Sequence, residues 1–341
     1  MSSTPPRSDE RVFTATVIRN YPDSATEARW RTFLSSSRWA SHFVSPEYFL
    51  DPKTKSRRPF AILVGDATEI VGCLTGWHEQ SRTVSGLSTH PQLLLADGPQ
   101  RHGVEKTLAL SLLEEARQDS FVDVRSWHEL TAFQELRFWS RKSNATYVID
   151  LATDEDGLFR RLAGKRRTGI RNALKKGLEV KEATVEDVLH FYEVLKVTHV
   201  RLGLGPPLPM DDLLAPESNR KLFVAMYEGR CIAGTIIRFS RSGLAEYSEN
   251  ASLSDFWQVN PNELLLWTAI KWANSAGCTG FNLGGYNLFK KEFGGTLYPM
   301  IRLSKDQSFL SLRHKREKLD SLARQMFRSV RNGIRARLRR K

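Results

Sequence analysis

The sequence has few cysteines, no long apolar run and no apolar segment at its N-terminus. Three cysteines occur in 341 residues, and the spacing of Cys73, Cys231 and Cys278 does not match a metal site. An odd number of cysteines also argues against a disulfide framework. No apolar stretch approaches the roughly 20 residues needed to cross a bilayer, and residues 1–10 lack the apolar core of a signal peptide. These absences predict a reducing, cytoplasmic setting.

Charge is distributed unevenly along the chain. Hydrophobic residues make up 40% and charged residues 26%, which is typical of a globular protein with a real core. The net charge is +13, but residues 311–341 carry 12 Lys/Arg against Glu317 and Asp320, so the remaining residues carry only +3. Apolar residues share one face of this segment if it is helical, which predicts a basic amphipathic tail. Such a tail fits three partners: the inner face of an anionic membrane, RNA, or the protein's own surface.

Turn residues and hydrophobic periodicity divide the chain into four parts. Residues 1–10 are predicted to be a disordered leader, and residues 307–341 are the basic tail. Residues 11–151 and 152–306 each alternate strands with helices, which predicts two α/β (α+β) units with mixed sheets flanked by helices. In the first unit the pattern predicts an exposed linker at 51–59, a helix at 129–140 and a strand at 145–151. In the second unit it predicts a helical stretch at 154–176, a strand at 243–252, and a buried helix whose capping box joins Asn260 and Glu263.

The predicted strand at 243–252 lacks a clean apolar face. Strict alternation places Ala245, Tyr247, Glu249 and Ala251 on one side, and Glu246, Ser248 and Asn250 on the other. Carboxylates on both sides indicate either a cleft or an edge strand with two solvated faces.

Basic residues line the predicted helix at 154–176. Arg167 and Arg171 lie with other basic residues on the polar side, which fits either an anion site or a solvated helix face. Arg166 lies in the middle of the apolar arc, where an unpaired charge would be costly. Either the helix bends at Gly164, or Arg166 pairs with a carboxylate or an anionic ligand.

Two glycine pairs, Gly284-Gly285 and Gly294-Gly295, bracket a short amphipathic segment. Glycine pairs allow positive φ angles and a close approach of backbone to a ligand. Between them, Phe289 and Phe293 have the i, i+4 spacing that anchors one helical turn, which would hold Lys290 at a fixed place beside a strand end. The alternative is a glycine-bounded turn with a solvated pair of lysines.

Four motifs of the second unit occur in an order that has a known counterpart. They are the basic segment 166–178, Phe191-Tyr192 with Thr198 and Arg201, the hairpin at 227–234, and Phe281-Asn282-Leu283-Gly284-Gly285 followed by Phe289-Lys290 and Phe293-Gly294. This order resembles the GNAT superfamily of acyltransferases, and more narrowly the Fem-type (peptidoglycan-bridge, FemAB-like) transferases and the BioF-like acetyltransferase domain. The resemblance implies a tandem of two GNAT-like units, the first degenerate, with a cleft between them.

Candidate roles follow from the resemblance and from the strand pattern. In the Fem-type group a lysine at the Phe-Lys position is implicated in catalysis, which here is Lys290, placed at the oxyanion of an acyl-transfer intermediate. The strand pattern makes Tyr247, with Glu249 or Glu246, a candidate for deprotonating or positioning an amine. The candidates for substrate binding are Arg166, Arg167 and Arg171, whose guanidinium groups suit phosphates, together with Asn282 and Phe289.

The chain departs from the family pattern in two places. Asn282 stands where the closing signature usually carries Asp, which weakens an acid–base role there. The glycine loop that binds the CoA pyrophosphate is missing, because residues 256–261 contain no glycine. The donor is therefore open between acyl-CoA, acyl-carrier protein and aminoacyl-tRNA.

The sequence thus predicts an N-acyltransferase that moves an acyl or aminoacyl group from an activated donor to an amine. Neither a metal nor a tightly bound cofactor is expected, because the donor is already activated. A cell-wall precursor, a polysaccharide sugar amine, a lipid or a protein could be the acceptor, and a role in cell envelope biosynthesis would fit the first of these. The competing hypothesis is a catalytically inactive GNAT-like scaffold that binds membrane or RNA through its tail.

Overall fold

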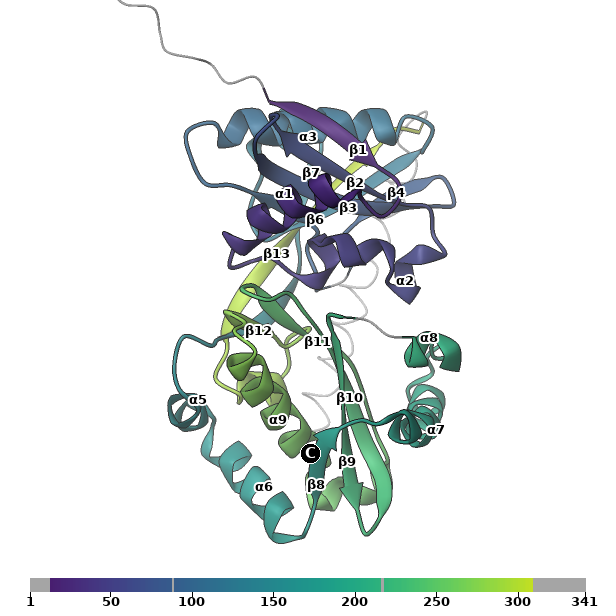
Figure 1. Cartoon of the computed structure of the whole chain (residues 1–341), viewed down its shortest axis with the longest axis vertical. Coiled ribbons are helices and arrows are strands. Elements are labelled where there is room, and N and C mark those ends of the chain that lie inside the picture. The colour runs from purple at the N-terminus through teal and green to yellow at the C-terminus, as the bar shows by residue number, and fades with distance from the viewer. Residues whose placement is uncertain (1–12, 88, 216–217, 309–341) are drawn as a thin grey trace, which may run out of the picture.

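The computed structural model describes residues 13–87, 89–215 and 218–308. The predicted leader and residues 309–341 of the basic tail lie outside this part, so the proposed partners of the tail stay predictions. The described chain forms two lobes that share one continuous mixed sheet (Figure 1). Within it, no helix is long and apolar enough to cross a membrane.

The first lobe, at the top of Figure 1, is a sheet with helices on both faces. Alternate residues of one strand point to two cores: Phe60, Ile62 and Val64 pack against the long helix α3, and Ala61 and Leu63 pack against α1. Its strands are β1 (Thr14–Ile18), β2 (Pro59–Gly65), β3 (Ile70–Glu79), β4 (Arg82–Ser85), β5 (Leu93–Leu95), β6 (Phe121–Ser126) and β7 (Trp139–Asp150). Its helices are α1 (Ser24–Ser35), α2 (Pro52–Lys55), α3 (Arg101–Glu115) and α4 (Thr131–Glu135), with 3-10 turns at His42–Val44 and Pro46–Phe49.

The second lobe has the same layered plan. Helix α9 covers one face of its strands and helix α7 the other, so Ile237 packs toward α9 and its neighbour Ile236 toward α7. The strands are β8 (Glu179–Glu182), β9 (Arg220–Tyr227), β10 (Arg230–Phe239), β11 (Leu244–Ser252), β12 (Gly280–Asn282) and β13 (Thr296–Asp306). The helices are α5 (Glu155–Arg161), α6 (Gly164–Lys175), α7 (Val185–Leu202), α8 (Met210–Leu214), α9 (Pro261–Ser275) and α10 (Leu288–Lys291), with a 3-10 turn at Ser254–Val259.

Two long strands join the lobes. The strand order is β1-β2-β3-β4-β6-β13-β7-β12-β11-β10-β9-β8, with β5 paired to β3. Strand β13 pairs with β7 along most of its length and with β6 through its last six residues. Its residues Ile301 and Leu303 belong to the core of the first lobe. The closing strand of the second half therefore completes the sheet of the first, as the band between the lobes in Figure 1 shows.

Three local predictions need correction. The predicted helix at 129–140 shrinks to α4, because residues 139–150 pair along β13 as the single strand β7. The helical stretch at 154–176 is two helices, α5 and α6, separated at Leu162 and Ala163. The capping box at α9 is absent: Asn260 is left-handed at φ +57° with no side-chain cap bond, and Glu263 binds Arg166 instead.

The predicted exposed linker at 51–59 is wrong in its first half, where α2 forms and where Asp51, Pro52 and Thr54 are buried. Asp51 is fully buried between the lobes, where its carboxylate lies 2.6 Å from His42 Nε2 and 2.6 Å from Arg238 Nε. Burial alone would raise the pKa of Asp51, but the His42 hydrogen bond and the Arg238 charge outweigh it and lower the pKa. Because the pKa is lowered in the folded state, this carboxylate contributes stability above about pH 4 that is lost as the pH falls.

Replacing Asp51 with Asn should destabilise the protein by about 3–5 kcal/mol at pH 7, because Arg238 would keep its buried charge without this partner. Urea unfolding at pH 7 measures the loss. Asp23→Asn is the matched control, because Asp23 caps α1 as Asp51 caps α2 but does so at the surface. Equal stabilities of the two variants would contradict the importance of the buried pair.

Candidate active site

The two central strands of the second lobe separate after a short parallel pairing. Strand β11 pairs with β12 at three positions only, the last of which joins Glu246 and Asn282. Beyond that point β12 ends, while β11 continues beside β10 to Ser252. We call the place where they separate, bordered by Gly284, Tyr247 and Lys290, the strand junction. Strand β11 is thus an interior strand, with β12 on one side and β10 on the other, and the edge-strand alternative is wrong.

The buried side chain of Asn282 fixes the backbone at the strand junction. Its Oδ1 atom accepts hydrogen bonds from Thr146 Oγ1 at 2.7 Å and from the Gly284 amide at 3.0 Å. Its amide nitrogen donates to the Thr89 carbonyl of the first lobe at 3.0 Å. Asn282 is fully buried and these bonds occupy it, so we assign it a positioning role instead of the predicted contact with substrate.

Gly284 is a glycine for steric reasons. Its φ angle is +69°, and a Cβ atom there would lie 2.7 Å from the carbonyl oxygen of Tyr247. The close approach keeps the turn against β11 and excludes any side chain at position 284.

Lys290 is turned inward at this place. Its Nζ atom donates to the Gly284 carbonyl at 3.0 Å and lies 5.5 Å from the centre of the Tyr247 ring. Burial lowers the pKa of Lys290 to about 8. The side chain is therefore still mostly charged at neutral pH but loses its proton more readily than an exposed lysine. The alternative of a solvated lysine does not hold for Lys290, whereas Lys291 is exposed.

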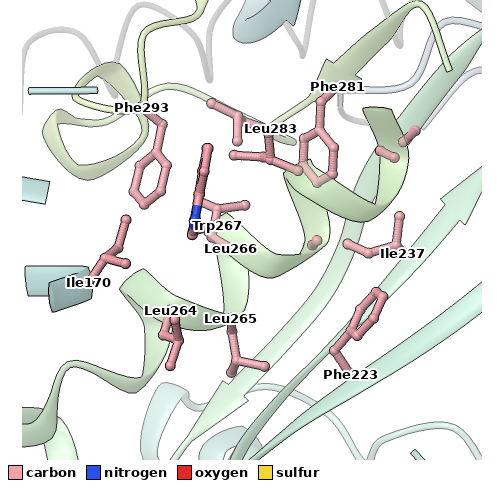
Figure 2. Packing of buried hydrophobic residues seen from close by; sticks show 14 of the residues in the cluster. Ile170, Phe223, Ile237, Leu264, Leu265, Leu266, Trp267, Phe281, Leu283 and Phe293 are labelled. Atoms are coloured by element: carbon pink, nitrogen blue, oxygen red, sulfur yellow. The ribbon is translucent and has the colours of Figure 1, made fainter. Parts of the chain in front are cut away.

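The helical turn α10 holds Lys290 as the spacing predicts. Asn287 caps the turn by accepting from the Lys290 amide at 2.9 Å, and the rings of Phe289 and Phe293 lie 5.1 Å apart. Figure 2 shows Phe293 in the core beside Trp267, with Leu283 above. Phe289 is half-buried, and its described contacts, with Phe293 and Arg166, hold the turn together.

Arg166 stabilises the same turn from α6. Its guanidinium donates to Glu263 at 2.6 Å and to Glu292 at 2.7 Å, and it lies 4.4 Å from the centre of the Phe289 ring. Of the alternatives drawn from the sequence, the structure shows both a break before the helix and a pairing with carboxylates. Since two carboxylates balance its charge, we assign Arg166 a positioning role in place of the predicted phosphate contact.

The three arginines of the basic segment do not form one site. Arg167 donates to the carbonyls of Arg160 and Leu162 at the end of α5. Arg171 is exposed and lies 5.4 Å from the Phe159 ring. Of the three, Arg171 is the most exposed and Arg166 is buried.

A β-bulge separates two residues that the sequence places together. Tyr247 is opposite Ile237 and Glu249 is opposite Ile236, so Ser248 is an extra residue between them. Tyr247 therefore faces α9, where burial raises its pKa, and Glu249 faces α7. There Glu249 accepts from His199 at 3.3 Å and lies 3.5 Å from Lys53 Nζ. The predicted alternation, which put Tyr247 and Glu249 on one side of the strand, is wrong at this bulge, and of these two residues Tyr247 is the one that borders the strand junction.

Sequence reasoning missed the residues that approach from the first lobe. The His90 ring forms a 2.7 Å hydrogen bond with Glu246, a residue 156 positions away. Thr89, beside it, lies within 3.9 Å of the place that a Cβ on Gly284 would occupy. The local pattern is only Thr-His-Pro in a short loop, and such a pattern carries no information on a partner in another lobe.

Comparison with known proteins bears on this geometry. The sequence model of the Acetyltransferase (GNAT) domain family matches residues 164–292, from the start of α6 to the end of the Lys290 turn. Residues 164–292 are a GNAT acetyltransferase domain. No curated protein sequence matches the chain.

Solved structures extend the likeness beyond the GNAT domain. FemX aligns with a TM-score of 0.66 at 15% identity, over 81% of this chain and 95% of FemX. L-PGS from Bacillus licheniformis aligns with a TM-score of 0.57 at 15% identity, over 87% of this chain and 96% of L-PGS. A tandem GNAT protein from the clavulanic acid biosynthesis pathway aligns with a TM-score of 0.55 at 10% identity, over 87% of this chain and 99% of that protein. At such low identities the structural likeness shows the fold alone. That fold confirms the predicted tandem GNAT architecture.

The GNAT domain and its fold class support an acyltransferase and do not favour the inactive scaffold. Within the described residues, no group of three or more His, Cys, Asp or Glu side chains is arranged to hold a metal ion.

The inward position of Lys290 predicts an unusual titration. Its side-chain NMR signals, in protein labelled at lysine, should titrate with a midpoint near pH 8, whereas exposed lysines titrate near 10.4. Lys290→Met identifies the signal by its disappearance. If the lost signal had titrated together with the exposed lysines, the buried position of the ammonium would be contradicted.

Proposed function

We propose that the protein is an N-acyltransferase that moves an acyl or aminoacyl group from an activated thioester or ester to an amine. The observation that carries the proposal is the position of Lys290, whose half-buried ammonium meets the Gly284 carbonyl at the strand junction. In acyl transfer, negative charge develops on the carbonyl oxygen of the donor, and a fixed positive group in a partly dry place stabilises it.

Lys290 is suited to this task because its position is set before substrate arrives. The Phe289–Phe293 contact, the Asn287 cap and the Arg166 bonds fix the turn on which it lies. A donor carbonyl oxygen would replace the Gly284 carbonyl as the acceptor of the Nζ hydrogen bond. With a pKa of about 8, Lys290 carries its proton at neutral pH and can meet that oxygen as a cation.

Acyl-CoA is the donor that the GNAT domain favours. The segment before α9 still lacks a glycine loop for the CoA pyrophosphate, since it forms the 3-10 turn Ser254–Val259 and the left-handed Asn260. This departure, together with the resemblance to Fem-type transferases, makes aminoacyl-tRNA the second candidate donor. We place the reaction in the cytoplasm because Cys73, Cys231 and Cys278 are all free and buried.

Transfer can be measured with two donors. Acetyl-CoA, mixed with glucosamine, spermidine or a lysine ester, should release free CoA thiol that a colorimetric reagent detects. Radiolabelled aminoacyl-tRNA with the same amines should give labelled amide. The proposal would be contradicted if the protein transferred acyl groups from neither donor faster than the reaction without protein.

Lys290→Met should lower kcat by about 10²–10³-fold with the donor that the wild type uses, because the oxyanion would lose its cation. The fold should persist, since the Nζ atom makes one hydrogen bond at the edge of the core. Urea unfolding checks stability and the thiol or amide assay checks kcat.

Lys291→Met is the matched control, because Lys291 lies on the same turn but is exposed. It should keep the kcat of the wild type. Full activity in Lys290→Met, or an equal loss in both variants, would rule out the assigned role of Lys290.

A further inference from the structure

A buried histidine–carboxylate pair joins the two lobes next to the strand junction. His90 Nδ1 and Glu246 Oε1 are 2.7 Å apart, and Glu246 is only 1% exposed. The other carboxylate oxygen, Oε2, is buried and has no hydrogen-bond partner among the residues that the structure describes. A pair of this kind can serve only to hold the two lobes together. Its position relative to Lys290 decides whether it can also take part in the reaction.

That position is set by Thr89 and Gly284. The second ring nitrogen of His90, Nε2, lies 3.4 Å from Thr89 Oγ1. The place that a Cβ on Gly284 would occupy is 3.9 Å from Thr89 Oγ1 and 3.8 Å from Lys290 Nζ. The Thr89 hydroxyl and the Lys290 ammonium therefore border the same small space, and His90 Nε2 is next to it on the Thr89 side.

The loop that carries His90 is held in place. Gln92 accepts from the Gly86 amide at 2.6 Å and donates to the Phe43 carbonyl at 3.3 Å. The ring of Phe43 packs at 4.8 Å from the His90 ring. Because Nδ1 is held by Glu246 and the ring is packed, Nε2 is the nitrogen left to exchange a proton.

The sheet separates the two halves of this arrangement. Lys290 and Tyr247 lie on the α9 face, whereas Glu246 lies on the other face together with Arg238, its register partner on β10. The two faces meet at the strand junction, where the pairing of β11 with β12 ends. A carbonyl held by Lys290 can thus be attacked by an amine that comes from the side of the first lobe.

We propose that His90 is the base that removes the proton of the acceptor amine, and that Glu246 is the positioning residue that orients its ring. The inference rests on the proposed function and adds that the acceptor enters on the first-lobe side. His90 Nε2 takes one proton from the ammonium, directly or through the Thr89 hydroxyl, and releases it to water. The neutral nitrogen forms the new C–N bond, the C–S or C–O bond of the donor breaks, and the second nitrogen proton ends on the leaving thiolate or alkoxide.

The test compares His90→Gln with His42→Gln, using the donor and the alkylamine that the wild type accepts. His42 forms a buried pair with Asp51 at 2.6 Å inside the first lobe, next to Arg238 of the second lobe, and no described contact joins His42 to Lys290. His90→Gln should lose about 10²–10⁴-fold in kcat with unchanged KM for the donor, and His42→Gln should keep the kcat of the wild type. The kcat of Glu246→Gln should lie between that of the wild type and that of His90→Gln.

A second acceptor distinguishes a catalytic base from a residue that only holds the two lobes together. Hydroxylamine is largely unprotonated at neutral pH, so it needs no base, and His90→Gln should recover most of the wild-type rate with it. An equal loss with both acceptors, or a loss no greater than that of His42→Gln, would overturn the assignment while wild-type transfer stands. If the wild type transfers from neither donor, the proposed function fails first, and the role of His90 falls with it.

Discussion

The arrangement of the active site depends on one buried amide, that of Asn282. Its hydrogen bonds connect β7 through Thr146, the glycine turn through the Gly284 amide, and the first lobe through the Thr89 carbonyl. Leaving a buried polar group without its partner costs about 1–3 kcal/mol, so the three segments are held together. The carbonyl that meets Lys290 and the loop that carries His90 are thus placed relative to each other by the same side chain.

The two-lobed plan has a chemical consequence. Residues 164–292 supply the α9 face with Lys290, whereas the first lobe brings His90 and the neighbouring Thr89 to Glu246, on the other side of β11. Strand β13 crosses from one lobe to the other and packs Ile301 and Leu303 in the first core. The lobes therefore share one sheet, which suits a site assembled from both.

The Lys290 turn could be predicted from sequence because its determinants are local. Glycine pairs, the i, i+4 phenylalanines and the Lys-Glu between them lie within twelve residues, and the structure confirms their contact. The failures come from information that is not local. One extra residue at Ser248 turns Glu249 to the face opposite Tyr247, and Asp51, in a stretch rich in charge and proline, is buried only because His42 and Arg238 surround it.

The central claim is that the Lys290 ammonium stabilises the charge that develops during transfer. The most direct measurement is kcat against pH with both substrates saturating. Since burial lowers the pKa of Lys290 to about 8, kcat should fall as the pH rises through that value, and Lys290→Arg, whose guanidinium keeps its proton, should show no such fall. A wild-type kcat that stays constant to pH 9.5 would contradict the account.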